Sequence, residues 1–236
     1  MDLVDAVRRG SRSLGALGFG APVACTYNPL DYAWDVHRNW LERYGKGTKE
    51  VLFVGMNPGP FGMVQTGVPF GEVAAVRGWL DLGGRIRSPE HVHPKRPVEG
   101  FACTRSEVSG RRVWNWAAAR FGTPEAFFRR FFVHNYCPLA FVAESGANLT
   151  PDKLPAAMTA PLFRICDRML AEVVAALQPR LVVGFGTFAE ARARAVLGED
   201  SVRIGRVLHP SPASPAANRG WEPQVEKGLR ELGVDL

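Results

Sequence analysis

The amino-acid sequence predicts a three-layer α/β/α fold, in which a four-stranded parallel sheet lies between two layers of helices. Four short apolar runs, each the length of a strand, alternate along the chain with segments whose apolar residues recur at helical spacing. Parallel strands that are buried on both faces have such continuous apolar runs, and helices connect them. We expect the 236 residues to form one domain, 1–236.

Residues 50–55 are expected to form the first strand, and the segment that follows is expected to be a rigid loop. The strand is almost wholly apolar, and a run rich in glycine and proline then ends it. Pro58 and Pro60 fix φ and have no backbone N–H, while the glycines let the backbone approach a ligand. Asn57 is the one polar side chain in this turn. At the carboxyl end of a core strand, it would project where open α/β sheets bind their ligands.

The other elements follow from apolar spacing and from helix-breaking residues. Residues 145–161 contain several prolines and are expected to form a connecting loop. Thr187 and Glu190 have the spacing of a capping box at the start of the helix after the third strand. The remaining strands are expected at 131–135, 180–184 and 203–208, and the helices at 2–17, around Trp34 to Tyr44, at 71–82, 112–121 and 163–177, and from Trp221 onward.

Each predicted strand ends in residues that are unusual for an ordinary loop. Asn57, Asn135 and His209 follow three of the strands, and the glycines of 184–186 follow the fourth. Because parallel strands end at the same edge of a sheet, these residues are expected to meet in a single site.

The chain has a formal net charge of +6, which permits a polyanionic partner without requiring one. Four of its basic residues lie in one loop, 85–97, and Arg105, Arg111 and Arg112 follow. For any single arginine, a solvated surface position remains the simpler interpretation. A basic loop beside a ligand site favours contact with phosphates, and the four residues of the loop are Arg85, Arg87, Lys95 and Arg96.

The cysteines and the apolar runs exclude several classes of protein. The four cysteines are widely separated, so the sequence favours buried free thiols over a metal site. No apolar run is long enough to cross a bilayer, and the first residues lack the features of a secretory signal. We therefore expect an intracellular protein that has no metal site and does not bind membranes.

The polar residues at the strand ends favour a particular kind of chemistry. No activated serine or cysteine accompanies them, and the Gly184-Phe185-Gly186 run is only half of a dinucleotide-binding fingerprint. Amides, one histidine and backbone N–H groups suit hydrolysis through an oxocarbenium-like state, in which water needs positioning more than a strong base. Taken singly, each residue could equally be structural: a turn residue, a strand-end cap or a core aromatic.

Three motifs give the sequence a resemblance to the single-strand-selective monofunctional branch of the uracil-DNA glycosylase superfamily. They are GMNPGPFGMVQTGVPFGE at 55–72, HNYCPL at 134–139, and HPSP at 209–212 with NRGW at 218–221. The resemblance spans most of residues 50–225. It implies an α/β/α fold with a four-stranded parallel sheet, excision of uracil and of uracils oxidised at the 5-methyl group from DNA, and no metal or organic cofactor.

The resemblance also implies roles for individual residues. Asn57 would hold the attacking water, and His209 would donate a hydrogen bond to uracil O2 as the base departs. Phe70 would stack on the flipped base, and Asn135 would read its pairing edge. Met56 would offer a backbone N–H.

Further implied roles concern the C5 position of the base and the DNA. Gly59 and Met63 would line the space around C5. Members of the family usually have an arginine that enters the duplex just after the histidine motif, and this chain has Ala213 there. The expected DNA contacts are Ser211, Pro212, Ala213 and Arg219, together with the four residues of the basic loop.

The implied partner is DNA that contains uracil, single-stranded or duplex, bound by a monomer in the cytoplasm or nucleoid of a bacterium or in the nucleus of a eukaryote. Two alternatives stay open at this point. One is a non-catalytic module that binds single-stranded nucleic acid through the basic loop and aromatic residues. The other is a sibling glycosylase specific for another deaminated base.

Overall fold

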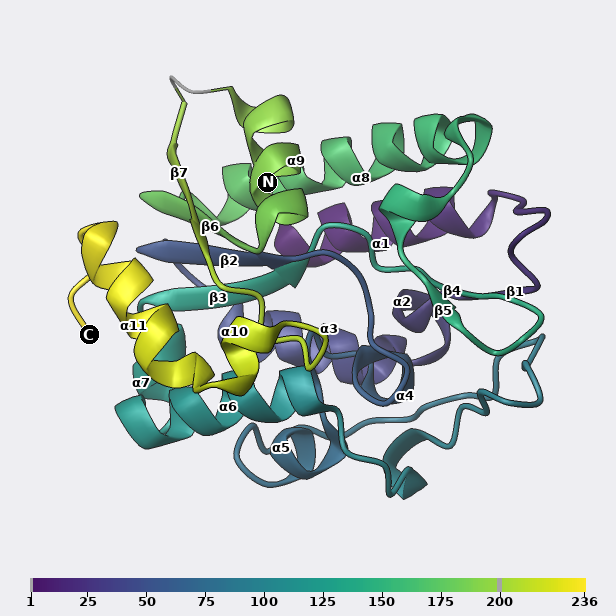
Figure 1. Cartoon of the computed structure of the whole chain (residues 1–236), viewed down its shortest axis with the longest axis horizontal. Helices are drawn as coiled ribbons and strands as arrows, with labels where there is room; N and C mark the ends of the chain where they lie inside the picture. Colours follow the sequence, from purple (N-terminus) through teal and green to yellow (C-terminus); the bar gives the residue numbers. More distant parts are fainter. Residues whose placement is uncertain (1, 199–200) are drawn as a thin grey trace.

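A computed structural model describes residues 2–198 and 201–236. A parallel sheet lies at its centre, with the strand order β3-β2-β6-β7 (Figure 1). Every residue of β2, β3 and β6 is buried, whereas the edge strand β7 exposes two arginines. The predicted four-stranded parallel sheet is therefore confirmed. Its strands are β2 (Val51–Gly55), β3 (Phe131–Asn135), β6 (Leu181–Phe185) and β7 (Arg203–Val207).

Helices cover both faces of the sheet, as predicted (Figure 1). One layer contains α1 (Leu3–Gly15), α8 (Ala156–Leu177) and α9 (Thr187–Leu197), and the other contains α3 (Trp34–Tyr44), α6 (Val108–Phe121), α7 (Pro124–Phe128) and α11 (Trp221–Glu231). The connections contain α2 (Pro29–Tyr32), α4 (Met63–Thr66), α5 (Val73–Arg77), α10 (Pro215–Asn218) and the 3₁₀ turns η1 (Gly100–Ala102) and η2 (Pro151–Lys153). In the described part of the chain, no helix is long and apolar enough to cross a membrane.

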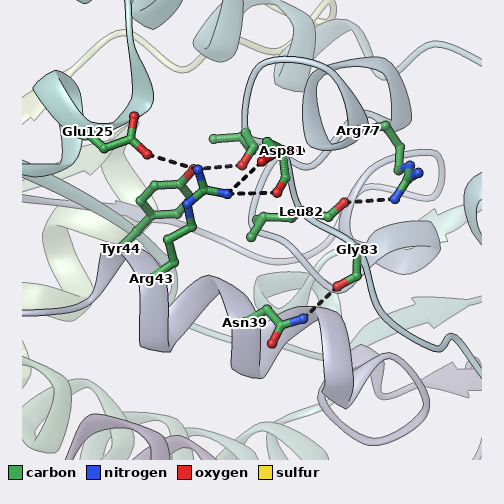
Figure 2. Close-up of polar contacts among 9 residues, drawn as sticks. Asn39, Arg43, Tyr44, Arg77, Asp81, Leu82, Gly83 and Glu125 are labelled. Carbon is green, nitrogen blue, oxygen red and sulfur yellow. Dashed lines mark hydrogen bonds and ion pairs between the residues drawn. The ribbon is translucent and has the colours of Figure 1, made fainter.

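The helix predicted at 71–82 is wrong beyond its first turn. α5 ends at Arg77, and Asp81 has a φ of 47°, which no helix accommodates. Figure 2 shows how side chains of α3 hold the segment that follows. Asn39 donates to the Gly83 carbonyl at 2.8 Å, and Arg43 donates to the Asp81 carbonyl at 2.9 Å. These tertiary bonds satisfy carbonyl groups of the non-helical segment after α5, which the apolar spacing alone did not reveal.

The connection predicted at 145–161 is more ordered than expected. α8 begins at Ala156, so Pro161 lies inside the helix. A proline there removes one backbone hydrogen bond, which the buried apolar stripe of a 22-residue helix outweighs. The same region holds part of a small antiparallel sheet, in the order β1-β4-β5, that the sequence pattern did not reveal. Its strands are β1 (Cys25–Tyr27), β4 (Ala140–Val142) and β5 (Asn148–Leu149).

The predicted capping box is also wrong. Gly186 occupies the N-cap of α9 with a φ of 82°, and no side chain caps the helix. Thr187 instead accepts a hydrogen bond from Arg206 at 3.1 Å, and Glu190 forms an ion pair with the same arginine. Both polar groups therefore bind the edge strand β7 and not the helix terminus. The four cysteines are buried free thiols, as predicted.

Two buried histidines lie behind the end of β3. His37 on α3 contacts the Gly67 carbonyl through Nδ1 at 2.6 Å. Burial lowers the pKa of His37 to about 4, and burial together with the charge of His37 lowers that of His134 to about 3. Both histidines are therefore neutral at neutral pH.

These lowered pKa values predict that acid destabilises the fold. A histidine whose pKa falls on folding contributes its full stability above about pH 6.5, and that contribution is lost as pH falls toward the folded value. From pH 7 to pH 5 the free energy of unfolding should fall by about 2 kcal/mol for each of the two histidines. Denaturant titrations at the two pH values measure this change. His37→Asn should reduce the fall in the free energy of unfolding, and His91→Asn, at an exposed position, should leave it unchanged. Equal falls in the wild type and both variants would contradict the prediction.

Candidate active site at the carboxyl edge of the sheet

A cavity of about 590 Å³ opens where the strands of the parallel sheet end. Its lining includes Asn57 after β2, Asn135 at the end of β3 and His209 after β7. The three polar residues that the sequence singled out thus meet in one place, as predicted. Also in the lining are Met56, Gly59, Met63, Phe70, Ser211 and Pro212.

Asn57 sits in a loop that the neighbouring strand holds in place. The amide of Cys137 donates to the Met56 carbonyl at 2.9 Å, which extends the β2–β3 pairing past the ends of both strands. The Asn57 amide nitrogen lies 3.5 Å from the Leu139 carbonyl, a long hydrogen bond. Within residues 2–198 and 201–236, no donor reaches its Oδ1. That oxygen is therefore available to accept a hydrogen bond from water.

Asn135 places an unsatisfied amide in the cavity wall. The residue is 2% exposed, its Nδ2 lies 3.2 Å from the Met63 sulfur, and its Oδ1 has no partner among the described residues. A thioether is a weak acceptor, so both ends of this amide lack strong partners. A buried amide left in this state costs free energy until a ligand with matching donors and acceptors binds it.

Phe70 is held in a strained backbone conformation beside Asn135. Its φ is 56°, uncommon for a bulky residue, and its carbonyl accepts a hydrogen bond from the Trp114 indole at 3.0 Å. A side chain at Gly110 would collide with that same carbonyl. The surrounding packing thus enforces the strain, which is typical of functional sites. The ring lies edge-on to Phe185, with centroids 5.2 Å apart.

His209 is neutral, and its tautomer is determined by its loop. Burial lowers the pKa of His209 to about 4. Nδ1 accepts a hydrogen bond from the Ser211 amide at 3.0 Å, so the proton lies on Nε2. His209 therefore presents an N–H donor at neutral pH and carries no charge.

Arg112 on α6 fixes the loop that carries His209. Its guanidinium donates to the Pro210 carbonyl at 2.9 Å, to the Ser211 carbonyl at 3.3 Å and to Asn218 Oδ1 at 2.8 Å. Asn218 in turn donates to the Pro212 carbonyl at 2.9 Å. Three successive carbonyls of the loop are thereby satisfied by two side chains.

Glu107 packs against the loop that contains Asn57, and the sequence did not indicate this role. Its carboxylate accepts a hydrogen bond from the Phe61 backbone, and burial raises the pKa of this carboxyl. Side chains at Gly59 or Gly62 would collide with it. No spacing or motif distinguished Glu107 from a surface glutamate, because only the fold brings it under the loop. Ser106, Asn148 and Thr150 in the lining were missed for the same reason.

The predicted DNA contacts lie outside the cavity, apart from Ser211 and Pro212 at its rim. Ala213 is exposed at the tip of a turn in which its amide donates to the Ser211 hydroxyl at 3.1 Å. Arg219 and Arg85 are exposed. Three predicted contacts already have protein partners: Arg87 binds Asp31, while Lys95 and Arg96 donate to the carbonyls of Ser145 and Gly146.

Known proteins resemble this chain in sequence and in fold. Residues 42–231 match the model of the uracil DNA glycosylase superfamily, and the chain belongs to that superfamily. It is 54% identical over 228 residues to the Rattus norvegicus protein named single-strand selective monofunctional uracil-DNA glycosylase, covering 96% of this chain and 82% of that protein. The Bos taurus protein named as a single-strand selective monofunctional uracil DNA glycosylase is 53% identical over 223 residues, 94% of this chain and 82% of that protein.

A solved structure supports the fold assignment. The crystal structure of wild-type Pedobacter heparinus SMUG2 matches with a TM-score of 0.69 over 99% of this chain and 97% of that chain, at 20% identity. At that identity the match shows the α/β fold alone. The family resemblance predicted from the three motifs is confirmed by the family model and the sequence relatives together.

The role of Arg112 leads to a prediction about the His209 loop. Arg112→Ala should let the Ser211 and Ala213 amides exchange with deuterium about tenfold faster, since a hydrogen bond to a charged group contributes roughly 1.5 kcal/mol or more. Native-state exchange followed by mass spectrometry measures this. Arg120→Ala is the matched control, because Arg120 ties the same helix to the Leu236 carbonyl, away from the site. Equal exchange at Ser211 in both variants would contradict the prediction.

Proposed function

We propose that this protein is a monofunctional uracil-DNA glycosylase, which flips uracil out of DNA and hydrolyses its N-glycosidic bond to leave an abasic site. One observation carries the proposal: Asn57, Asn135, Phe70 and His209 line one cavity in a chain of the uracil DNA glycosylase superfamily. The names of the 54% identical relatives support the same activity.

Base recognition is assigned to Phe70 and Asn135. The Phe70 ring offers a face for stacking, and the Asn135 amide can donate to uracil O4 while accepting from N3–H. Cytosine presents the opposite pattern on this edge, so it would leave both amide atoms unpaired. The unsatisfied Oδ1 of Asn135 supports this assignment.

Hydrolysis is assigned to Asn57 and His209. As the bond between C1′ and N1 breaks, the sugar becomes oxocarbenium-like and negative charge builds on uracil. Nε2–H of His209 donates to O2 and stabilises that charge, while the Asn57 side chain holds a water against C1′ and the Met56 backbone N–H binds the substrate. The water oxygen bonds to C1′ and releases a proton to solvent, and the uracil anion takes up a proton from solvent. A neutral histidine suits this role, because it donates a hydrogen bond without adding a cation beside the positively charged sugar.

Selectivity at C5 is assigned to Gly59 and Met63. Both line the cavity, and the Glu107 carboxylate leaves no room for a side chain at Gly59. We extend the proposal to 5-hydroxymethyluracil as a second substrate. We also propose that the chain acts as one domain and as a monomer, on single-stranded and duplex DNA, within the cell compartment that holds the genome. Ser211, Pro212, Ala213 and Arg219 are proposed to contact the DNA.

The proposed function is tested by base release from oligonucleotides that carry a single uracil, hydroxymethyluracil, hypoxanthine, xanthine or no lesion. Alkaline cleavage then reveals abasic sites. Wild type should release uracil, and Asn57→Ala should lose on the order of a hundredfold or more in single-turnover rate while keeping its DNA affinity. Release of hypoxanthine or xanthine in preference to uracil would favour a sibling specificity. Binding without any base release would identify a nucleic-acid-binding module and overturn the proposal.

The short side chain of Ala213 leads to a prediction about which uracil-containing substrates, single-stranded, U:G or U:A, react fastest. Extruding a base from a duplex costs a few kcal/mol, and an inserted side chain offsets part of that cost. Ala213 is too short to fill the gap, so single-turnover rates at fixed salt should be higher on single-stranded uracil and U:G pairs than on U:A pairs. Ala213→Arg should raise the rate on U:A more than on single strands. Equal wild-type rates on all three substrates would mean that another residue fills the gap, and Arg219→Ala would test one exposed candidate.

A further inference from the structure

The ring of Phe61, at the rim of the cavity, makes cation–π contacts with two arginine side chains. The Arg105 guanidinium carbon lies 3.8 Å from the ring centroid, and that of Arg96 lies 5.5 Å from it. Phe61 itself lines the cavity, and its backbone N–H is held by the Glu107 carboxylate. The stack is therefore attached to the same loop that positions Asn57.

Neither arginine has a counter-charge within the protein. Among residues 2–198 and 201–236, no carboxylate forms an ion pair with Arg96 or Arg105. Arg96 gives its Nε–H to the Gly146 carbonyl at 2.7 Å. The Arg105 guanidinium makes no hydrogen bond to any described residue, and it stacks on the Phe61 ring. Stacking restricts this long side chain and leaves its N–H donors free.

Two unpaired cations around one ring repel each other, and an anion between them would relieve the repulsion. A guanidinium prefers planar, bidentate acceptors, of which a phosphodiester is one. A DNA strand whose base occupies the cavity crosses its rim, and Phe61 is one of the residues that line the cavity. Neither spacing nor motif marked Arg105 as a contact, because only the fold places it on this ring.

We propose that Arg105, stacked on Phe61 and assisted by Arg96, forms a binding site for one backbone phosphate next to the flipped nucleotide. The proposal rests on the proposed glycosylase function, which supplies the strand. Phe61 acts as a positioning residue, since it would orient the guanidinium without touching the phosphate.

Salt-dependent binding tests this site. The probe is a single-stranded oligonucleotide whose one deoxyuridine carries a 2′-fluorine, because fluorine destabilises the oxocarbenium-like state and prevents hydrolysis during the titration. Fluorescence anisotropy gives Kd over a series of salt concentrations. For Arg105→Ala the slope of log Kd against log salt should become shallower by about 0.7, the value for one lost phosphate contact on a single strand. Affinity at low salt should fall on the order of tenfold.

Conservative variants separate stacking from charge. Arg105→Lys and Phe61→Leu both keep the charges, so each should keep the wild-type slope and still bind severalfold more weakly. Arg12→Ala is the matched control, because it removes an arginine of α1 that does not line the cavity. Its slope and its affinity should equal those of the wild type. Thermal melting of each variant verifies folding.

Two results would overturn the proposed site: a wild-type slope for Arg105→Ala, or an equal change for Arg12→Ala, which would indicate a general effect of net charge. Uracil release by the wild type is measured in parallel. An active wild type with an unchanged Arg105→Ala slope would refute the phosphate site alone. A wild type that releases no base would refute the proposed glycosylase function, whatever the slopes show.

Discussion

The geometry of the cavity depends on the absence of a side chain at Gly55. The parallel register pairs this glycine with Asn135 across β2 and β3. A Cβ at Gly55 would collide with Asn135 Oδ1 and with the Phe70 ring, which both occupy the space above it. The Asn135 amide and the Phe70 ring can therefore lie side by side only because the residue between them at the strand end has no side chain. Asn57 follows two residues later, so the same backbone that admits the base also places the group assigned to the water.

The histidine of the site is uncharged, and cationic side chains lie around the cavity. Burial keeps His209 uncharged and raises the pKa of the Glu107 carboxyl. The arginines around Phe61 lie outside the cavity, where they meet solvent or a polyanion. This separation suits a reaction in which cationic sugar and anionic base develop next to each other, because a fixed charge inside would favour one at the expense of the other. Hydrogen-bond donors and dipoles act on the departing base without that cost.

The sequence was sufficient to predict the central sheet, because its strands are apolar on both faces and their ends carry distinctive residues. Asn57, Asn135 and His209 could be assigned to one edge from topology alone, and the structure brings them together. Glu107, Arg112 and Arg105 could not be found in this way. Each acts through contacts with residues distant in the chain, and nothing in its local sequence separates it from a surface charge. The helix predicted at 71–82 failed for a related reason, since side chains of α3, distant in the sequence, hold the carbonyls of the non-helical segment after Arg77.

The unsatisfied amide of Asn135 links the stability of the empty protein to its affinity for the base. Its Oδ1 lost water on folding and gained no partner within the described residues, so the empty protein is less stable than its packing alone would make it. On the proposed function, uracil restores those hydrogen bonds, and part of its binding free energy is the recovery of this deficit. The free base, as the product, recovers the same deficit and competes for the cavity. A site made selective by an unpaired buried group is thus also prone to retain its product, and departure of the base becomes a step that can limit turnover.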